Sequence, residues 1–279
     1  MRGKKCWKRV TAVLMAFMML VGLVMTNGIT SEAYWYNSEG ERYPNVGYRT
    51  HVQSKGWERT LTLNGRTSGT VGAGKRLEAI QIIVEPGYGV GVEYRTHIQS
   101  KGWEKTWKKD GETSGTSGEA KRLEAIQIRL TGTNKNKYDI YYRVQAQTYG
   151  WLGWVKNGAY AGTAGQAKRL EAIKIQLTGA DKEKYDVYYR VHAQSYGWLA
   201  WATNGAPAGT AGLAKRLEAI QIVIVKKGES FDHAIGNIQS ARGEAYIASS
   251  TANANPVVTG ENNVNVEYRT HVQSFGWQG

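Results

Sequence analysis

The clearest hydrophobic pattern lies in residues 185–194, which read YDVYYRVHAQ. Every second residue from Tyr185 to Ala193 is apolar or aromatic, and the residues between them are mostly polar. Successive side chains of a β-strand point to opposite faces, so this alternation predicts a strand with one face turned towards a core. The predicted inner face consists of Tyr185, Val187, Tyr189, Val191 and Ala193.

This pattern belongs to an internal repeat. A Gly-Trp pair recurs at spacings of 46, 48 and 47 residues, at Trp57, Trp103, Trp151 and Trp198. A glutamate within the phrase RLEAI recurs at spacings of 46, 47 and 47, at Glu78, Glu124, Glu171 and Glu218. Two independent markers with one period establish tandem repeats. We place four of them at about 46–84, 92–130, 138–177 and 185–225, with a truncated fifth at 264–279.

Three short strands are predicted in each repeat. The alternating strand comes first, and the RLEAI phrase forms the third strand. Between them stands an Asn-Gly or Asp-Gly pair, which suits a tight hairpin turn with positive φ at both central residues; the pairs are 64–65, 110–111, 157–158 and 204–205. Sustained helical spacing is missing after residue 33. The expected fold is all-β and pseudo-symmetric, either prism-like or a closed array of repeats.

The third strand contains a charge where the pattern predicts a core. Alternation places Glu78 on the same face as Ile80 and Ile82, with Arg76 beside it. A buried carboxylate is costly unless it is paired, so we expect an Arg–Glu pair in every repeat. We favour a structural joint between repeats, because a feature present in every unit of an array usually holds the units together. The alternative is a ligand clamp or a pair of acid/base groups.

The two ends of the chain read differently from the repeats. Residues 1–33 carry a basic start, an apolar stretch and Ser31-Glu32-Ala33, which predicts a signal peptide cleaved before Tyr34. Its removal takes away Cys6, the only cysteine, and leaves 31 basic and 22 acidic residues, a net charge near +9. Residues 226–263 are rich in small polar residues and are expected to be a linker or insert. We expect 227–279 to be poorly ordered.

The combined motif resembles a known family. YR-x-H/Q-x-Q-x-x-GW, followed by N/D-G, GT and RLEAI, is similar to the ChW repeat, the clostridial hydrophobic repeat with a characteristic tryptophan. The resemblance covers about 46–225 and 264–279. It implies an exported protein of a clostridial Gram-positive bacterium, secreted or associated with the cell wall, with an extracellular binding role towards surface polysaccharide or other proteins. The chain departs from the family's habits in having four complete repeats and no companion catalytic module.

The tryptophans fall into two sets. The Gly-Trp set is uniform, which indicates core residues whose indole N–H is bonded to the backbone. A second tryptophan follows at variable places, and these residues are the candidates for exposed platforms that stack on a sugar face: Trp107, Trp154 and Trp201. Cross-strand packing within the repeat is the alternative.

The polar face of the first strand supplies the other candidates. An Arg, an imidazole and a carboxamide in a row offer donors and acceptors for hydroxyls or a carboxylate, namely Arg95, His97, Gln99, Arg190, His192 and Gln194. A solvated sheet face is the alternative. Gln145 stands where the other repeats carry histidine, which argues against a titrating group or a metal ligand at this position.

Catalytic motifs are missing. The sequence lacks H-E-x-x-H, G-x-S-x-G, a phosphate-binding glycine loop and, after cleavage, a cysteine nucleophile. We therefore expect a secreted, non-catalytic module that binds cell-surface or extracellular polysaccharide, including anionic wall polymers, without a cofactor or metal. Nucleic acid and membrane are not expected partners. The alternative is a module that assembles other secreted proteins, and a glycan-active enzyme ranks below both.

Overall fold

The computed structural model describes residues 46–59, 61–63, 65–84, 89–231, 233, 240 and 242–250, and the backbone of 270–272 and 276–278. The predicted signal peptide and residues 251–263 lie outside this part of the chain. Two short 3-10 turns, η2 (Lys135–Lys137) and η3 (Lys182–Lys184), are its helical elements, and its other elements are strands. The prediction of an all-β fold is confirmed. None of the described helices has the length and apolar character needed to cross a membrane.

Each repeat is built around one long antiparallel pair. The first strand is β1 (Val46–Val52), β6 (Gly91–Ile98), β11 (Asp139–Ala146) or β16 (Tyr185–Ala193). The last strand is β5 (Leu77–Val84), β10 (Leu123–Thr131), β15 (Leu170–Thr178) or β20 (Leu217–Lys226). Within every repeat these two strands pair along their whole length.

Two short strands fold back onto the other side of the first strand. The Gly-Trp strand is β2 (Gly56–Trp57), β7 (Gly102–Trp103), β12 (Gly150–Trp151) or β17 (Gly197–Trp198). The next is β3 (Thr62–Leu63), β8 (Lys108–Lys109), β13 (Val155–Lys156) or β18 (Ala202–Thr203). Both pair with the first strand of their own repeat.

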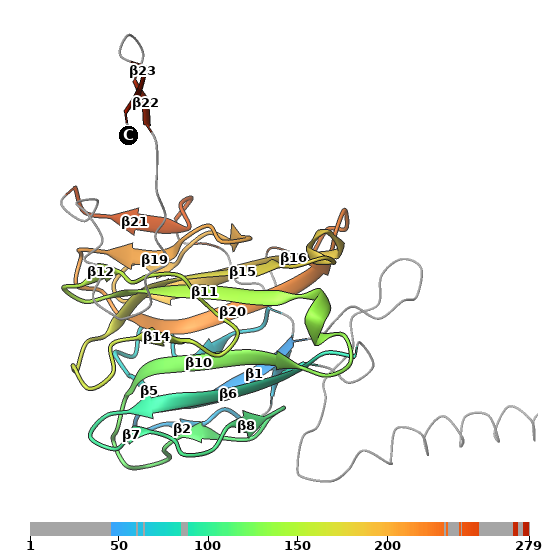
Figure 1. Ribbon diagram of the computed structural model, residues 1–279. Coiled ribbons are helices and arrows are strands. Elements are labelled where there is room, and N and C mark those ends of the chain that lie inside the picture. Colours follow the sequence, from blue (N-terminus) through green and yellow to red (C-terminus); the bar gives the residue numbers. More distant parts are fainter. Residues whose placement is uncertain are drawn as a thin grey trace, which may run out of the picture.

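One strand of each repeat joins the sheet of a neighbouring repeat. These exchanged strands are β4 (Ser68–Gly69), β9 (Ser114–Gly115), β14 (Tyr160–Gly162) and β19 (Ala208–Ala211). β9, β14 and β19 pair with the last strand of the preceding repeat, and β4 of the first repeat pairs with β20 of the fourth. The four sheets therefore close into a ring, as in a four-bladed propeller (Figure 1).

The exchange corrects the predicted hairpin. Positive φ at both turn residues is found at Asn157 and Gly158 (43° and 99°) and at Asn204 and Gly205 (44° and 90°). The strands on either side of this turn, however, pair with different sheets and not with each other. The Asn-Gly pair thus redirects the chain from its own sheet to the neighbouring one. A local turn signal fixes the backbone bend but does not choose the partner strand.

A tyrosine hydroxyl from each repeat completes the contact between neighbours. Tyr142 Oη accepts a hydrogen bond from the backbone N–H of Ile128 (2.7 Å), and the backbone N–H of Gly158 donates to the Ile128 carbonyl (2.7 Å). Tyr94, Tyr189 and Tyr48 accept from the corresponding backbone N–H of the preceding repeat around the ring. Burial raises the pKa of Tyr142 and Tyr189 to about 12, so both hydroxyls stay protonated at neutral pH.

A β-bulge explains how the glutamate enters the interior. In the first repeat Val52 pairs with Leu77 and His51 pairs with Ala79, so Glu78 is the extra residue between them. The other three repeats have the same register shift at Glu124, Glu171 and Glu218. The predicted alternation with Ile80 and Ile82 is therefore broken at Glu78, and Glu78 and Ala79 are both buried.

The cores of the four repeats are filled in two different ways. In repeat 2 the carboxylate of Glu104 accepts hydrogen bonds from the Thr96 N–H (3.1 Å), the Thr96 hydroxyl (3.2 Å) and Ser114. Glu58 is bonded similarly in repeat 1, and burial raises its pKa. Repeats 3 and 4 have apolar residues at all three positions: Val144, Leu152 and Ala161, and Val191, Leu199 and Ala208.

The chain after the fourth repeat packs against the ring. β21 (Tyr246–Ala248) pairs in parallel with β19, and the two strands lie side by side in Figure 1. The Ala200 N–H donates to the Glu244 carbonyl (3.0 Å), and the Gly209 N–H donates to the Ala245 carbonyl (2.9 Å). Residues 242–250 therefore act as an insert and not as a free linker. The expectation of poor order is wrong for them.

The start of the fifth repeat forms the same local pairing as the first. β22 (Thr270–Val272) pairs with β23 (Gly276–Gln278), with His271 opposite Trp277 and Val272 opposite Gly276. In the first repeat His51 lies opposite Trp57, and Val52 lies opposite Gly56. The two pairs of strands therefore share one register.

Strand exchange depends on a glycine in each exchanged strand. Gly162 has φ of +131°, and a Cβ there would lie 2.4 Å from the Glu124 carbonyl oxygen. Gly165 also has positive φ (+74°), but a Cβ there would meet nothing within 4 Å. We expect Gly165→Ala to cost about 1–2 kcal/mol of unfolding free energy and Gly162→Ala about 1–3 kcal/mol more. Denaturant titration of both variants tests this, and equal losses would contradict the exchanged-strand contact.

The polar core set of repeat 2 and the apolar core set of repeat 3 should replace one another only when all three residues are exchanged together. Glu104→Leu alone leaves the hydroxyls of Thr96 and Ser114 without their carboxylate and should destabilise the protein by about 1–3 kcal/mol. The triple variant Thr96→Val, Glu104→Leu, Ser114→Ala installs the set found in repeat 3 and should recover most of that loss. Thermal or denaturant unfolding of the single and triple variants measures the coupling. A triple variant less stable than Glu104→Leu would show that the sets are not equivalent.

Candidate ligand-binding site

An arginine stacked on tryptophan recurs in every repeat. The first-strand guanidinium carbon lies 5.1–5.8 Å from the centroid of the Gly-Trp indole in the pairs Arg49–Trp57, Arg95–Trp103, Arg143–Trp151 and Arg190–Trp198. In repeats 2, 3 and 4 the same arginine also lies 5.0, 5.6 and 4.6 Å from the second tryptophan. Cations placed this close to indole rings are attracted by the ring quadrupole. The second tryptophan and the first-strand arginine thus form one cluster.

A glutamine completes this cluster in three repeats. The Nε of Arg49, Arg95 or Arg190 donates to the side-chain oxygen of the glutamine directly opposite on the last strand: Gln81, Gln127 or Gln221. Repeat 3 has Lys174 at this place, opposite Arg143. The Lys174 ammonium lies 5.0 Å from the Trp151 ring. Burial and the neighbouring Arg143 lower the pKa of Lys174.

The three predicted platforms have different surroundings. Trp154 is exposed, with 37% of its surface accessible. Trp201 packs edge-on against Phe231 (5.1 Å between centroids) and donates its indole N–H to the His233 carbonyl (2.9 Å). Trp107 lies beneath the Arg129 guanidinium at 4.1 Å. Trp154 is therefore exposed, whereas Trp107 and Trp201 are half-buried, each against a neighbouring side chain. Sugar stacking by these indoles stays a prediction.

The Gly-Trp tryptophans are less uniform than expected. Trp198 is buried, whereas Trp57, Trp103 and Trp151 are half-buried. Trp57 donates its indole N–H to the Ser117 hydroxyl of the next repeat (3.1 Å), and Trp151 donates to the Tyr246 hydroxyl (3.0 Å). The predicted bond to the backbone is thus wrong for these two indoles, which are held by side chains from other segments.

The first-strand histidines are internal. His97 and His192 are buried, and their Nδ1 atoms lie 3.2 and 3.3 Å from the carboxylates of Glu124 and Glu218. Each imidazole also packs edge-on against the Gly-Trp indole. Gln145 takes this place in repeat 3 and is also buried. The two histidines were candidates for ligand contact on a solvated face, and their burial corrects that expectation.

The remaining candidates on the first strand are also mostly structural. Arg190 is fully buried, and its guanidinium donates to the Ser240 hydroxyl (3.2 Å). Arg95 is half-buried between its two tryptophans. The backbone N–H groups of Gln99 and Gln194 donate to the carbonyls of Arg122 and Arg216, which fixes the end of the sheet.

The predicted Arg–Glu pairs are confirmed in all four repeats. The distances are 3.3 Å for Arg76–Glu78, 3.3 Å for Arg122–Glu124, 3.1 Å for Arg169–Glu171 and 3.3 Å for Arg216–Glu218. The carboxylates are buried, and Glu124 also accepts from the Gly165 N–H of the next repeat (2.9 Å). These contacts support the reading of the pair as a joint between repeats.

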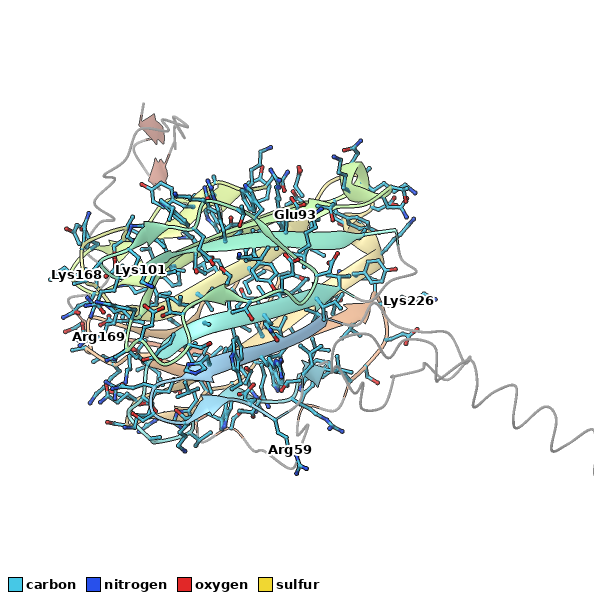
Figure 2. The ribbon with its side chains drawn as sticks, turned by 90° about the horizontal axis from the view of Figure 1, so that it is seen from below. Arg59, Glu93, Lys101, Lys168, Arg169 and Lys226 are labelled. Carbon is cyan, nitrogen blue, oxygen red and sulfur yellow. The ribbon has the colours of Figure 1, made fainter. Side chains whose placement is uncertain are left out.

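A lysine stands directly before the arginine of every joint. These lysine–arginine pairs are at 75–76, 121–122, 168–169 and 215–216, and the arginine of each is the one paired with the joint glutamate. Figure 2 shows Lys168 and Arg169 at one end of the body beside Lys101, and Lys226 at the opposite end. The described part of the chain has no group of three His, Cys, Asp or Glu side chains that could hold a metal ion.

Two residues of the repeat 3 cluster were missed from the sequence. Lys174 stands where the other repeats have glutamine, and this departure from the phrase AIQI was the available signal. Tyr246 comes from β21, outside the repeats, and its ring lies 5.8 Å from that of Trp151. No feature of the local sequence predicts the contact of Tyr246 with Trp151, because this contact depends on the packing of the insert.

The fold and the recurring cluster define an all-β tandem-repeat protein, closed into a ring by strand exchange. The family described as "Clostridial hydrophobic W" (ChW) matches residues 51–86, 97–132, 145–179 and 192–226, a little over half of the chain. The protein belongs to this family. Searches of curated proteins and of solved structures found no match.

The buried His192 predicts a pH dependence. Burial lowers the pKa of this imidazole, although the Glu218 carboxylate opposes the shift. The folded state therefore prefers neutral His192, and stability is lost as the pH falls below the unfolded-state pKa of about 6.5. His192→Gln, the residue type of repeat 3, should reduce the loss of melting temperature between pH 7.5 and pH 5.5.

Above pH 7.5 the imidazole is neutral in both the folded and the unfolded chain, so the two proteins should differ by a constant amount. This plateau is the internal control for the substitution itself. An unchanged slope below pH 7 in the variant would show that other groups set the acid sensitivity.

Proposed function

We propose that this protein binds extracellular polysaccharide through the outer face of its third repeat and has no catalytic role. The observation that carries the proposal is the exposed indole of Trp154 next to the Arg143 guanidinium. An indole face stacks on the apolar face of a sugar ring, and a guanidinium donates to hydroxyl or carboxylate oxygens. The corresponding tryptophans of repeats 2 and 4 are half-buried, and each has a neighbouring side chain packed against it.

Charge supports a polymer with acidic groups. The chain has a formal net charge of +13, and removal of residues 1–33 leaves a net charge near +9. A positive surface attracts anionic partners at long range. The proposed setting is outside the cell or at the cell wall, as the amino-terminal segment suggests, and wall polymers are the anionic polysaccharides found there.

The recurring carboxylates support the non-catalytic role. Glycoside hydrolysis needs two carboxyl groups on either side of an accessible bond. The glutamates found in every repeat are buried, and each is paired with the arginine two residues before it. These carboxylates therefore serve the fold and not catalysis.

A specific observation favours protein binding as the second candidate. The fourth-repeat cluster is covered by a segment of the same chain, in which Phe231 packs on Trp201 and the His233 carbonyl accepts the Trp201 N–H. β21 also adds a strand to β19. A polypeptide can therefore occupy this kind of cluster, and a partner's peptide could do the same on repeat 3.

Trp154→Ala, compared with Trp201→Ala, tests the proposed function. Trp154→Ala should weaken binding to insoluble Gram-positive cell wall by about tenfold, since a stacked aromatic is a typical hot spot, and should leave the melting temperature nearly unchanged. Trp201→Ala should instead lower the melting temperature, because it removes packing against Phe231. Pull-downs and thermal melts of both variants measure these effects.

Protease treatment of the wall material separates the two candidates. Binding that survives removal of wall proteins supports a polysaccharide target, and binding that disappears supports a protein target. Unchanged binding by Trp154→Ala to both materials would overturn the assignment to the third repeat.

A further inference from the structure

The strand pair at the centre of each cluster differs in one repeat. In repeats 1, 2 and 4 the arginine and the residue opposite it form a matched donor and acceptor, Arg with Gln. In repeat 3 the pair is Arg143 and Lys174, two cations directly opposite each other on neighbouring antiparallel strands. Like charges in this position destabilise a sheet. The third repeat therefore accepts an unfavourable contact that the other three avoid.

The surroundings of this pair hold both cations at the indole of Trp151. The Arg143 guanidinium lies 5.1 Å from the Trp151 centroid, and the Lys174 ammonium lies 5.0 Å from it. The Tyr246 hydroxyl accepts a hydrogen bond from the Trp151 N–H, which holds the indole ring in place. Both cations are half-buried, so neither is fully hydrated.

We propose that Arg143 and Lys174 form an anion-binding subsite, which takes a carboxylate or phosphate group of the polymer that stacks on Trp154. This inference rests on the proposed function and names the ligand chemistry of the same face. A guanidinium binds two oxygens of such a group in one plane, and an ammonium adds a second charge without a fixed direction. An anion between the two cations would turn their repulsion into shared attraction.

The pattern among the repeats argues against a purely structural lysine. A structural role is already served by glutamine in the other three repeats, where it satisfies the arginine by hydrogen bonding. Burial and then Arg143 lower the pKa of Lys174, the direction expected where the charged ammonium form is disfavoured. Residues at functional sites often lower stability in exchange for binding, and Lys174 next to an exposed aromatic side chain fits this pattern.

Lys174→Gln is the decisive variant, because it gives repeat 3 the residue pair of the other repeats. Lys156→Gln is the matched control, since it removes the same charge from an exposed lysine of the same repeat. The probes are polygalacturonate for carboxylate, poly(glycerol phosphate) teichoic acid for phosphate, and cellulose as a neutral polymer. Binding is measured by affinity electrophoresis or pull-down, and stability by thermal melting without polymer.

We expect Lys174→Gln to raise the melting temperature by a few degrees and to lose at least fivefold in affinity for one of the two anionic polymers. The polymer affected identifies the anion as carboxylate or phosphate. Lys156→Gln should lose less than twofold, and neither variant should change binding to cellulose. This combination of higher stability with weaker binding is not produced by a merely structural residue.

Three results would overturn the subsite. They are unchanged affinity for both anionic polymers in Lys174→Gln, equal losses in the two variants, and no anionic polymer bound by the unmodified protein. Binding to an anionic polymer that Trp154→Ala weakens but Lys174→Gln does not would overturn the subsite and leave the proposed function standing. If Trp154→Ala binds every material as well as the unmodified protein does, the proposed function fails as well.

Discussion

The open edge of the last strand in each repeat is the constraint on which this structure depends. One edge of β5, β10, β15 or β20 pairs within its own repeat, and the other would expose unpaired backbone groups. The next repeat covers that edge with its exchanged strand, its tyrosine hydroxyl and the N–H of its Asn-Gly or Asp-Gly turn. Every repeat needs a following repeat to cover the open edge of its last strand. For the fourth repeat, β4 of the first repeat covers that edge by pairing with β20, and this closes the ring.

This shared requirement leaves the inside and the outside of the repeats free to differ. Inside, repeats 1 and 2 have a Thr–Glu–Ser set, and repeats 3 and 4 have apolar residues at the same three positions. Outside, the cluster is covered by Arg129 in repeat 2 and by Phe231 in repeat 4, and it is open at Trp154 in repeat 3. A pseudo-symmetric frame thus presents an asymmetric surface.

The chain beyond the fourth repeat contributes to that asymmetry. It covers the fourth-repeat cluster with Phe231 and His233, and it supplies Tyr246 to the third-repeat cluster by hydrogen bonding to Trp151. A segment with no repeat signature therefore helps decide which aromatic side chains face solvent. Its small polar composition is compatible with this role, because the contacts are made by a few aromatic residues and by backbone groups in β21.

The sequence by itself determined the period, the all-β class, the core face of the first strand and the Arg–Glu pairs, because these depend on residues close together in the chain or on one strand. Only the tertiary structure decided the exchange of strands, which places the two sides of each Asn-Gly turn in different sheets. It also decided the β-bulge that turns Glu78 inward, the burial of His97 and His192, and the exposure of Trp154 but not Trp201. These features depend on which distant segment covers a side chain, and no local pattern specifies that partner.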